Sequence, residues 1–350
     1  MRDKIFTLCI ALLATTSLWA QSGTCGDNLT WSLANGVLTI SGSGDMTDYA
    51  PASIVPWNQY WLSITSVVIG DSVTSIGSFA FRDYSSLTSV TIGNSVTSIG
   101  KWAFEGCRDL TSVTIPNSVT SIGDRAFSSC SGLTSIVVES GNRTYDSRGN
   151  CNAVIETAKN KLIAGCRNTF IPNSVTSIGE AAFFFCSGLT SVTIPNSVTS
   201  IGRSAFQNCS GLTSVTIPNS VTFIDGYAFY GCSGLTTVTI GSSITSIGAW
   251  AFEGLLGLKS ITCYVMTPPV CDEHTFWNVD KAITLYVPDA SMTAYRTCNV
   301  WKEFMNILPI EAGIEQVEAS NAPKKILRNG QVLILHPNGT RYDSTGKKVE

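Results

Sequence analysis

The sequence predicts an α/β repeat solenoid, in which short units of similar sequence stack into a rod. A stretch of 23 residues recurs with small changes, and apolar residues take the same places in most copies. One such unit cannot bury its own apolar edge, so neighbouring units must stack. Units begin at Ile64, Leu87, Leu110, Leu133, Cys166, Leu189, Leu212 and Leu235.

The unit at residues 110–132 shows the expected elements in order. Val113 and Ile115 are spaced by two, as in a strand with one buried face. A Pro-Asn pair then predicts a turn, and a second extended piece follows at residues 119–122. Residues 124–130 are long enough for about one helical turn.

Equivalent positions of stacked units are expected to form ladders of side chains. The isoleucine ladder comprises Ile92, Ile115, Ile171, Ile194, Ile217 and Ile240. The phenylalanine ladder comprises Phe81, Phe104, Phe127, Phe183, Phe206, Phe229 and Phe252. The glycine of each Ser-Ile-Gly triplet is expected to mark a positive φ or a close backbone approach.

The pattern Leu-x-x-Val-x-Ile-Pro-Asn-Ser-Val-x-x-Ile-Gly-x-x-Ala-Phe-x-x-Cys resembles the BspA-like, Treponema-type leucine-rich repeat. The resemblance covers about residues 64–257. It implies a leucine-rich-repeat solenoid with a curved parallel β-sheet on the concave side, short helical turns and a cap at each end. Similar proteins are bacterial surface or secreted proteins, and some are adhesins. The family has no common catalytic residue, and the resemblance implies no cofactor.

The composition argues against charged polymers as partners. Only 13% of the 350 residues are charged, against about 25% in ordinary domains, and the net charge is −3. A charge-poor, weakly acidic surface lacks the basic groups that nucleic acids or anionic membranes attract. We therefore expect neither as a partner.

Residues 1–20 have a basic start, an apolar run and a small residue at Ala20. These features predict a secretory signal peptide cleaved before Gln21, although a core helix or membrane anchor would also be apolar. The run is short for a membrane span, and no later segment is apolar enough for one. The mature chain is therefore expected to be secreted or held on the outer cell surface.

Residues 21–63 depart from the period and resemble the family's N-terminal cap. Asn35-Gly36 between alternating segments predicts a β-hairpin. Trp31, Trp57 and Trp61 are interpreted as covering the open end of the array, since an uncovered apolar edge would aggregate. The alternative is a platform on which sugars stack.

An insertion at about residues 139–165 enlarges the unit that begins at Leu133. Extended pieces at residues 153–155 and 162–164 predict a hairpin that projects from the array. A loop that departs from a regular scaffold often carries binding function. Similar insertions nevertheless occur across the family that the repeat resembles, so the insertion alone does not indicate binding.

The C-terminal part changes pattern after residue 257. Residues 258–310 resemble the family's C-terminal cap and include a short helix begun by Asp289. An acidic linker at residues 311–323 leads to residues 324–350, where two Asn-Gly pairs predict a meander of three strands. This segment resembles the sorting signals of type IX secretion, and the alternative is a small adhesion or packing module.

The cysteines follow the repeat and form no Cys-x-x-Cys pair. Five share one register: Cys107, Cys130, Cys186, Cys209 and Cys232. Stacked side chains that point the same way suit packing better than the twisted geometry of a disulfide, and a metal site is the weakest interpretation. Cys151 with Cys166, and Cys263 with Cys271, are the likelier bridges if the compartment is oxidising.

The sequence offers little for catalysis. His274, in Cys-Asp-Glu-His, and His336 are the two histidines. Four consecutive residues rarely converge on one metal, and a His-dependent hydrolase would need a nucleophile motif that the chain lacks. Phosphate-loop and dinucleotide motifs are also missing. We expect no enzyme activity, no catalytic residue and no metal.

The outward face of the predicted sheet remains as the candidate binding site. Its side chains alternate with the buried Val and Ile residues, and most carry hydroxyl groups. The candidates are Ser112, Thr114, Phe170, Ser191, Thr193, Ser214, Thr216, Thr237 and Thr239. This neutral surface could hydrogen-bond host or microbial proteins or glycans, as in an adhesin, although Thr also simply favours strands. A self-associating structural scaffold is the alternative function.

Overall fold

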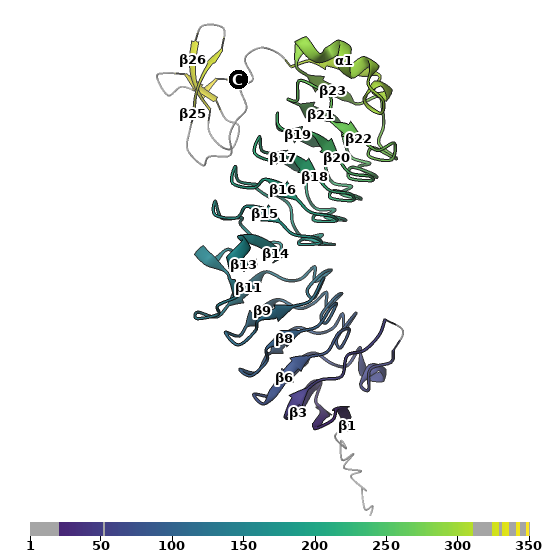
Figure 1. Cartoon of the computed structure of the whole chain (residues 1–350), viewed down its shortest axis with the longest axis vertical. Coiled ribbons are helices and arrows are strands. Elements are labelled where there is room, and N and C mark those ends of the chain that lie inside the picture. The colour runs from purple at the N-terminus through teal and green to yellow at the C-terminus, as the bar shows by residue number, and fades with distance from the viewer. Residues whose placement is uncertain are drawn as a thin grey trace, which may run out of the picture.

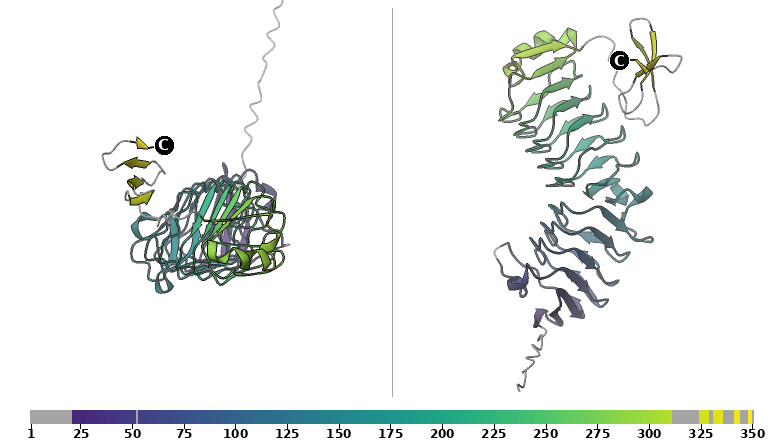
Figure 2. Two further views of the ribbon diagram at one scale, coloured as in Figure 1. Left: turned by 90° about the horizontal axis from the view of Figure 1, so that it is seen from above. Right: turned by 180° about the vertical axis from the view of Figure 1, so that it is seen from behind.

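The computed structural model describes residues 21–51 and 53–310, together with the backbone of four short strands beyond residue 323. Residues 21–310 form one long stack of turns, as Figure 1 shows. Viewed from above, the turns lie over one another (Figure 2). The predicted repeat solenoid is confirmed. The proposed signal peptide and linker lie outside the described residues.

Most turns contribute to two lines of parallel strands. The first line contains β3 (Val37–Gly42), β5 (Ser66–Ile69), β7 (Ser89–Thr91), β9 (Ser112–Ile115), β11 (Ser135–Val138), β17 (Ser214–Ile217), β19 (Thr237–Ile240), β21 (Ser260–Cys263), β23 (Thr284–Val287) and β24 (Asn306–Pro309). The second contains β4 (Gly44–Asp45), β6 (Val73–Ile76), β8 (Ser98–Ile99), β10 (Ser121–Ile122), β15 (Ser177–Ile178), β16 (Ser200–Ile201), β18 (Phe223–Ile224), β20 (Ser246–Ile247) and β22 (Val270–Cys271). Residues 168–171 and 191–194 form no regular strand, so the first line is interrupted there.

The segment after each second strand is a hydrogen-bonded turn and not the expected helical turn. In the unit of residues 87–109, both Trp102 (φ 53°) and Gly106 (φ 74°) are left-handed, which a right-handed helix cannot accommodate. The amides of these turns instead donate to the next unit, as from Phe104 to the carbonyl oxygen of Ala126 at 2.8 Å. The turns therefore form a third ladder along the solenoid.

The glycines of the Ser-Ile-Gly triplets serve close approach and not positive φ. A Cβ added to Gly202 would lie 2.9 Å from the backbone nitrogen of Glu180 in the preceding turn, and Gly100 and Gly123 face similar contacts. The left-handed residue comes two positions later, for example at Trp102. Glycine is thus needed where successive turns touch.

The phenylalanine ladder is closed at each end by a tryptophan. Successive rings stack with centroids 5.2 Å apart for Phe81 and Phe104. The ring of Trp57 stacks on Phe81 at 5.5 Å, and at the other end the ring of Trp301 meets Phe276 edge-on at 5.1 Å. Both tryptophans are fully buried, so they cover ring faces that would otherwise meet water.

The N-terminal segment contains the predicted hairpin. Strands β1 (Gln21–Gly26), β2 (Leu29–Ala34) and β3 are antiparallel, and β3 then pairs in parallel with β5, the first strand of the array. Asn35 and Gly36 both have positive φ, as the two-residue turn of such a hairpin requires. A short 3-10 turn, η1 (Asn58–Tyr60), follows before the array.

The insertion forms the predicted hairpin but does not project. It comprises β12 (Tyr145–Asp146), η2 (Arg148–Asn150), β13 (Ala153–Glu156), η3 (Thr157–Lys159) and β14 (Lys161–Gly165). Strand β14 pairs in parallel with β15, which places the hairpin between β11 and β15 within the stack (Figure 1). The expectation of a projecting loop is wrong, because both faces of β13 are apolar and buried.

Strand β13 divides the interior into two cores. Ala153 and Ile155 pack in the core of the C-terminal half, whereas Val154, on the opposite face, packs in that of the N-terminal half. Successive side chains of a strand point to opposite faces, so one strand can serve both cores. The insertion is therefore a partition across the solenoid.

After the array, η4 (Asp289–Ser291), α1 (Met292–Thr297) and η5 (Trp301–Glu303) supply the predicted short helix. Among the described residues, no helix is long and apolar enough to span a membrane. Beyond residue 323, strands β25 (Lys324–Arg328), β26 (Gln331–Leu335), β27 (Arg341–Asp343) and β28 (Lys348–Val349) form an antiparallel sheet. The meander thus has four strands, one more than predicted.

Candidate binding face

We call the outward side chains of the nine candidate residues the hydroxyl face. All nine lie on the outer side of the first line of strands or of the irregular segments that replace them. Eight are exposed, and Thr239 is half-buried. None of the eight hydroxyl groups makes a hydrogen bond to another described side chain or backbone group, so these hydroxyls are available to a ligand.

The face is most regular on β17 and β19. Ser214 lies beside Thr237, and Thr216 lies beside Thr239, in a parallel register. Neighbouring strands are about 4.8 Å apart, so the hydroxyls form two short rows. The rows do not run the length of the array, because the units that contain Ser191 and Phe170 have no regular strand at this position.

An apolar spot interrupts the hydroxyl face near the insertion. Phe170 is 54% exposed and Val137 is 44% exposed, and both occupy the register position of Thr114. The turn η2 lies beside Phe170, since Gly149 is placed so that an added Cβ would lie 3.7 Å from its ring. The amide of Phe170 also donates to the carbonyl oxygen of Cys151 at 3.1 Å. The alternation of the sequence places both residues on this face, as breaks in the rows of hydroxyls, although only Phe170 was selected as a candidate for binding.

A second set of threonines, one residue before the hydroxyl face, has a structural role. The hydroxyl of Thr134 donates to the carbonyl oxygen of Thr111 at 3.0 Å, and that of Thr236 donates to Thr213 at the same distance. These contacts link consecutive units. Threonines at the first of these positions therefore link consecutive units. Only the hydroxyl groups at the next position, on the hydroxyl face, remain free to bind a ligand.

The cysteines of the shared register pack as expected. The thiol of Cys107 donates to the carbonyl oxygen of Phe81 at 3.2 Å, and that of Cys232 donates to Phe206 at 2.9 Å. Burial raises the pKa of Cys130 to about 12. All eleven described cysteines are free thiols.

The two disulfides considered from the sequence are therefore not formed in this structure. Cys151 and Cys166 pack into different cores, on opposite sides of the partition. Cys263 is instead within 3.1 Å of the hydroxyl oxygen of Tyr295. All four of these cysteines are free, so neither proposed pair forms a disulfide.

His274 belongs to a row of aromatic side chains. Its ring stacks on Trp250 with centroids 4.3 Å apart and lies 5.3 Å from Trp277. Its Nδ1 is 3.0 Å from a carboxylate oxygen of Asp272. In the described part of the chain, no three His, Cys, Asp or Glu side chains gather as a metal site would require. His336 lies outside the described residues.

The tryptophans do not form a common sugar platform. Trp31 and Trp57 are buried, with ring centroids 6.1 Å apart, and Trp57 donates its indole N–H to the carbonyl oxygen of Ala80. Trp61 is 41% exposed and lines a separate hollow of about 300 Å³ with Phe79. Two of the three rings therefore have no face open to a sugar.

The repeat is matched by a known family model. The model for the BspA type leucine rich repeat region, in six copies, matches residues 58–161 and 161–282. A comparison with curated proteins finds no match.

Several solved structures resemble the chain. The pneumococcal vaccine antigen PcpA is 16% identical over 83% of this chain and 99% of its own, with a TM-score of 0.55. A leucine-rich repeat protein from Eubacterium ventriosum is 23% identical over 82% and 93%, with a TM-score of 0.43. A leucine rich cell surface protein from Faecalibacterium prausnitzii is 25% identical over 69% and 94%, with a TM-score of 0.39. The likeness to PcpA shows a shared fold.

Proposed function

Because the chain belongs to the BspA type leucine-rich repeat family, we propose that it is a secreted or cell-surface bacterial binding protein that recognises host or microbial proteins or glycans through the hydroxyl face. A surface role in protein binding is consistent with this family. The hydroxyl face combines unpaired hydroxyl groups with exposed apolar side chains.

The apolar spot carries the proposal. Phe170 and Val137 are exposed large side chains on a face otherwise lined by hydroxyls. An aromatic side chain surrounded by polar neighbours is typical of the residues that dominate binding energy. The free hydroxyls of Thr114, Ser191 and Thr193 would supply hydrogen bonds around it.

Export is part of the proposal. The signal peptide at residues 1–20 and the sorting or anchoring segment at residues 324–350 would place the array outside the cell. PcpA, which has the same fold, is described as a vaccine antigen, and this is compatible with exposure on a cell. N-terminal sequencing of protein recovered from the cell surface or medium should begin at Gln21, and recovery of the intact Met1 form from the cytoplasm alone would contradict export.

Self-association is the second candidate. Within the described part of the chain, strand β24 pairs with one strand, β23; Met305, just before β24, and Leu308, within it, have exposed side chains. An edge strand with apolar neighbours can pair with another chain. Assembly that rises with protein concentration in the absence of any ligand would favour this role. We propose no catalytic role.

Binding of the purified protein to a panel of matrix proteins and polysaccharides tests the main proposal. We expect saturable binding to at least one member, lost in Thr193→Lys and Thr216→Lys and weakened at least tenfold in Phe170→Ala. The matched control is Phe223→Ala, because Phe223 is also exposed but lies on β18, in the second line of strands. Equal ligand affinity of the Phe170→Ala variant and the wild-type protein would contradict a role for the apolar spot.

A further inference from the structure

The ladder of turns is broken at one place. In intact parts, each turn donates three amides to the next: Trp102 to Asp124 at 3.0 Å, Phe104 to Ala126 at 2.8 Å and Gly106 to Ser128 at 2.9 Å. The same pattern holds in the C-terminal half, for example from Phe206 to Ala228 at 2.7 Å. This hydrogen-bond pattern continues from unit to unit only where each unit has such a turn.

The unit that begins at Leu133 has the insertion in place of this turn. The third amide of the preceding turn, that of Ser129, skips this unit and donates to the carbonyl oxygen of Phe184 at 2.9 Å. The first two, of Arg125 and Phe127, have no hydrogen-bond acceptor among the described residues. The side of the break formed by the preceding turn therefore presents two unpaired backbone N–H groups, two residues apart in the sequence.

The opposite wall offers an acceptor. In the intact pattern, the carbonyl oxygen of Arg203 accepts from Ala181 at 2.9 Å, but the equivalent carbonyl of Glu180 receives no bond from any described residue. Strand β14 fills only the inner part of the space that the missing turn would occupy, where Gly165 donates to the carbonyl oxygen of Ala182 at 2.8 Å. The outer part of this space is left open.

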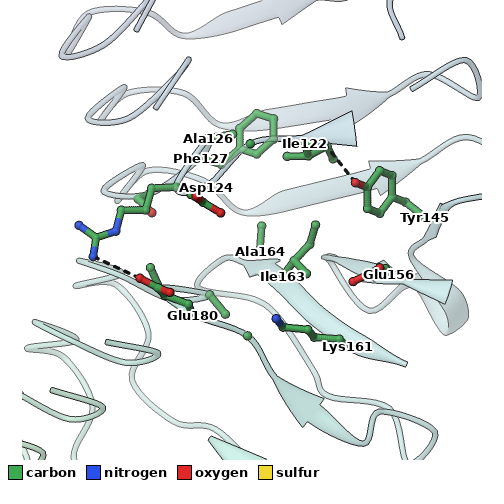
Figure 3. A pocket seen from close by; sticks show the side chains of 16 residues that line it. Ile122, Asp124, Ala126, Phe127, Tyr145, Glu156, Lys161, Ile163, Ala164 and Glu180 are labelled. Atoms are coloured by element: carbon green, nitrogen blue, oxygen red, sulfur yellow. Dashed lines mark hydrogen bonds and ion pairs between the residues drawn. The ribbon is translucent and has the colours of Figure 1, made fainter. Parts of the chain in front are cut away.

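This opening is a cleft of about 270 Å³, which we call the junction cleft (Figure 3). Its floor includes Phe127, Ile163 and Ala164, and its rim includes Arg125, Lys161 and Glu180. Across the rim, a guanidinium nitrogen of Arg125 is 4.0 Å from a carboxylate oxygen of Glu180. The volume lies just below the range of about 300–1,000 Å³ typical of small-molecule sites.

The chain satisfies one backbone group at this break with a side chain. The amide of Ile122, at the unpaired edge of β10, donates to the hydroxyl oxygen of Tyr145 at 3.1 Å (Figure 3). The amides of Arg125 and Phe127 have no such substitute. A backbone group that is withdrawn from water gains free energy when it finds a partner, so these two donors favour an occupant with acceptors.

We propose that the junction cleft binds a short extended peptide segment of a partner protein, whose alternate backbone carbonyls accept hydrogen bonds from Arg125 and Phe127. Donors on alternate residues match the carbonyl spacing of an extended chain, as when a peptide adds a strand to a sheet edge. A backbone amide of the peptide reaches the carbonyl of Glu180. This site is separate from the hydroxyl face.

The charges of the cleft favour a peptide over an anion. Asp124, Glu156 and Glu180 line it together with Arg125 and Lys161. The three carboxylates would repel a phosphate or a sulfate. They would not repel a neutral peptide backbone. The apolar floor suits one small or medium aliphatic side chain.

The test uses the purified full chain and a library of random hexapeptides with acetylated and amidated ends. We expect selected peptides to bind saturably and to slow hydrogen exchange at the amides of Arg125 and Phe127 at least tenfold. Ala164→Trp, which fills the floor, should abolish binding. Ala158→Trp is the matched control, because Ala158 is exposed on η3 of the same insertion, outside the cleft.

Lys161→Glu on the rim provides a second variant that leaves the floor intact, and it should change which peptide charges are selected. Phe170→Ala should leave peptide binding unchanged, so failure at the hydroxyl face would be distinguishable from failure here. The proposal is overturned if no peptide binds, if bound peptides leave both amides unprotected, or if Ala164→Trp binds as the wild type does. Protection of these amides by monosaccharides but by no peptide would also overturn it.

Discussion

The amide of Ser129 donates to the carbonyl oxygen of Phe184 at 2.9 Å, which joins two turns whose units are not consecutive in the sequence. The turn that should lie between them is replaced by the hairpin β13–β14. At this point one backbone hydrogen bond links successive turns, whereas three usually link them elsewhere in the solenoid. The same region holds the partition between the two cores and the junction cleft.

Tyr145→Phe should destabilise the protein by about 1–3 kcal/mol, because it removes the acceptor of the Ile122 amide and leaves a partly buried donor unpaired. The loss is measured by urea denaturation and by faster hydrogen exchange at Ile122. Tyr60→Phe is the control, since the hydroxyl of Tyr60 accepts from the exposed side chain of Gln59. Equal effects of the two variants would show that the Tyr145 bond is unimportant.

Trp57→Ala should destabilise the N-terminal half by about 3–5 kcal/mol, because it removes a fully buried ring and uncovers the face of Phe81. The measurement is the urea midpoint followed by circular dichroism. Trp61→Ala removes a ring that is 41% exposed and should have a much smaller effect. If both variants unfold at the same urea concentration, Trp57 does not close the ladder as described.

Much of the fold follows from the period of the sequence. Residues such as Phe104 recur at one place in every complete unit, so their stacking and burial could be predicted without coordinates. The same alternation placed Thr216 and Phe170 on the outward face. Trp102 and Arg125 could not be predicted as left-handed, because bulky residues rarely adopt positive φ and no local signal marks them.

The partition was missed for a different physical reason. The run Ala153-Val154-Ile155 is continuously apolar, which is typical of a strand buried on both faces. That signal was present, but an insertion was expected to lie outside the stack. The junction cleft has no sequence signal of its own, because it arises between units separated by the insertion.

Stability should fall as the pH rises above about 9, partly through the buried thiols. Burial raises the pKa of Cys130 to about 12, against an ordinary value of about 9. Between these values the unfolded thiol releases its proton and the folded thiol does not, so stability falls by about 1.4 kcal/mol per pH unit for each such group.

Cys130→Val should therefore lose about 1 kcal/mol less than the wild type between pH 9 and pH 10, where the unfolded thiol goes from half to almost fully ionised, as measured by urea denaturation at each pH. The comparison concerns the slope with pH, so a change in stability at neutral pH does not affect it. Identical slopes in the two proteins would show that Cys130 ionises in the folded state or stays protonated in both.

The two cores should unfold as separate units. The core with Phe104 and the core with Phe229 are separate clusters of buried residues on the two sides of the hairpin, and repeat proteins are stabilised mainly by contacts between neighbours. Phe229→Ala, which removes a fully buried ring, should speed hydrogen exchange of core amides between residues 175 and 287 and leave those between residues 64 and 119 within a factor of about two. Phe104→Ala should give the reverse pattern, measured by mass spectrometry of peptic fragments. Because β13 belongs to both cores, its amides should respond to both variants. If each variant instead accelerates exchange equally throughout the array, the hairpin couples the two cores and does not divide them.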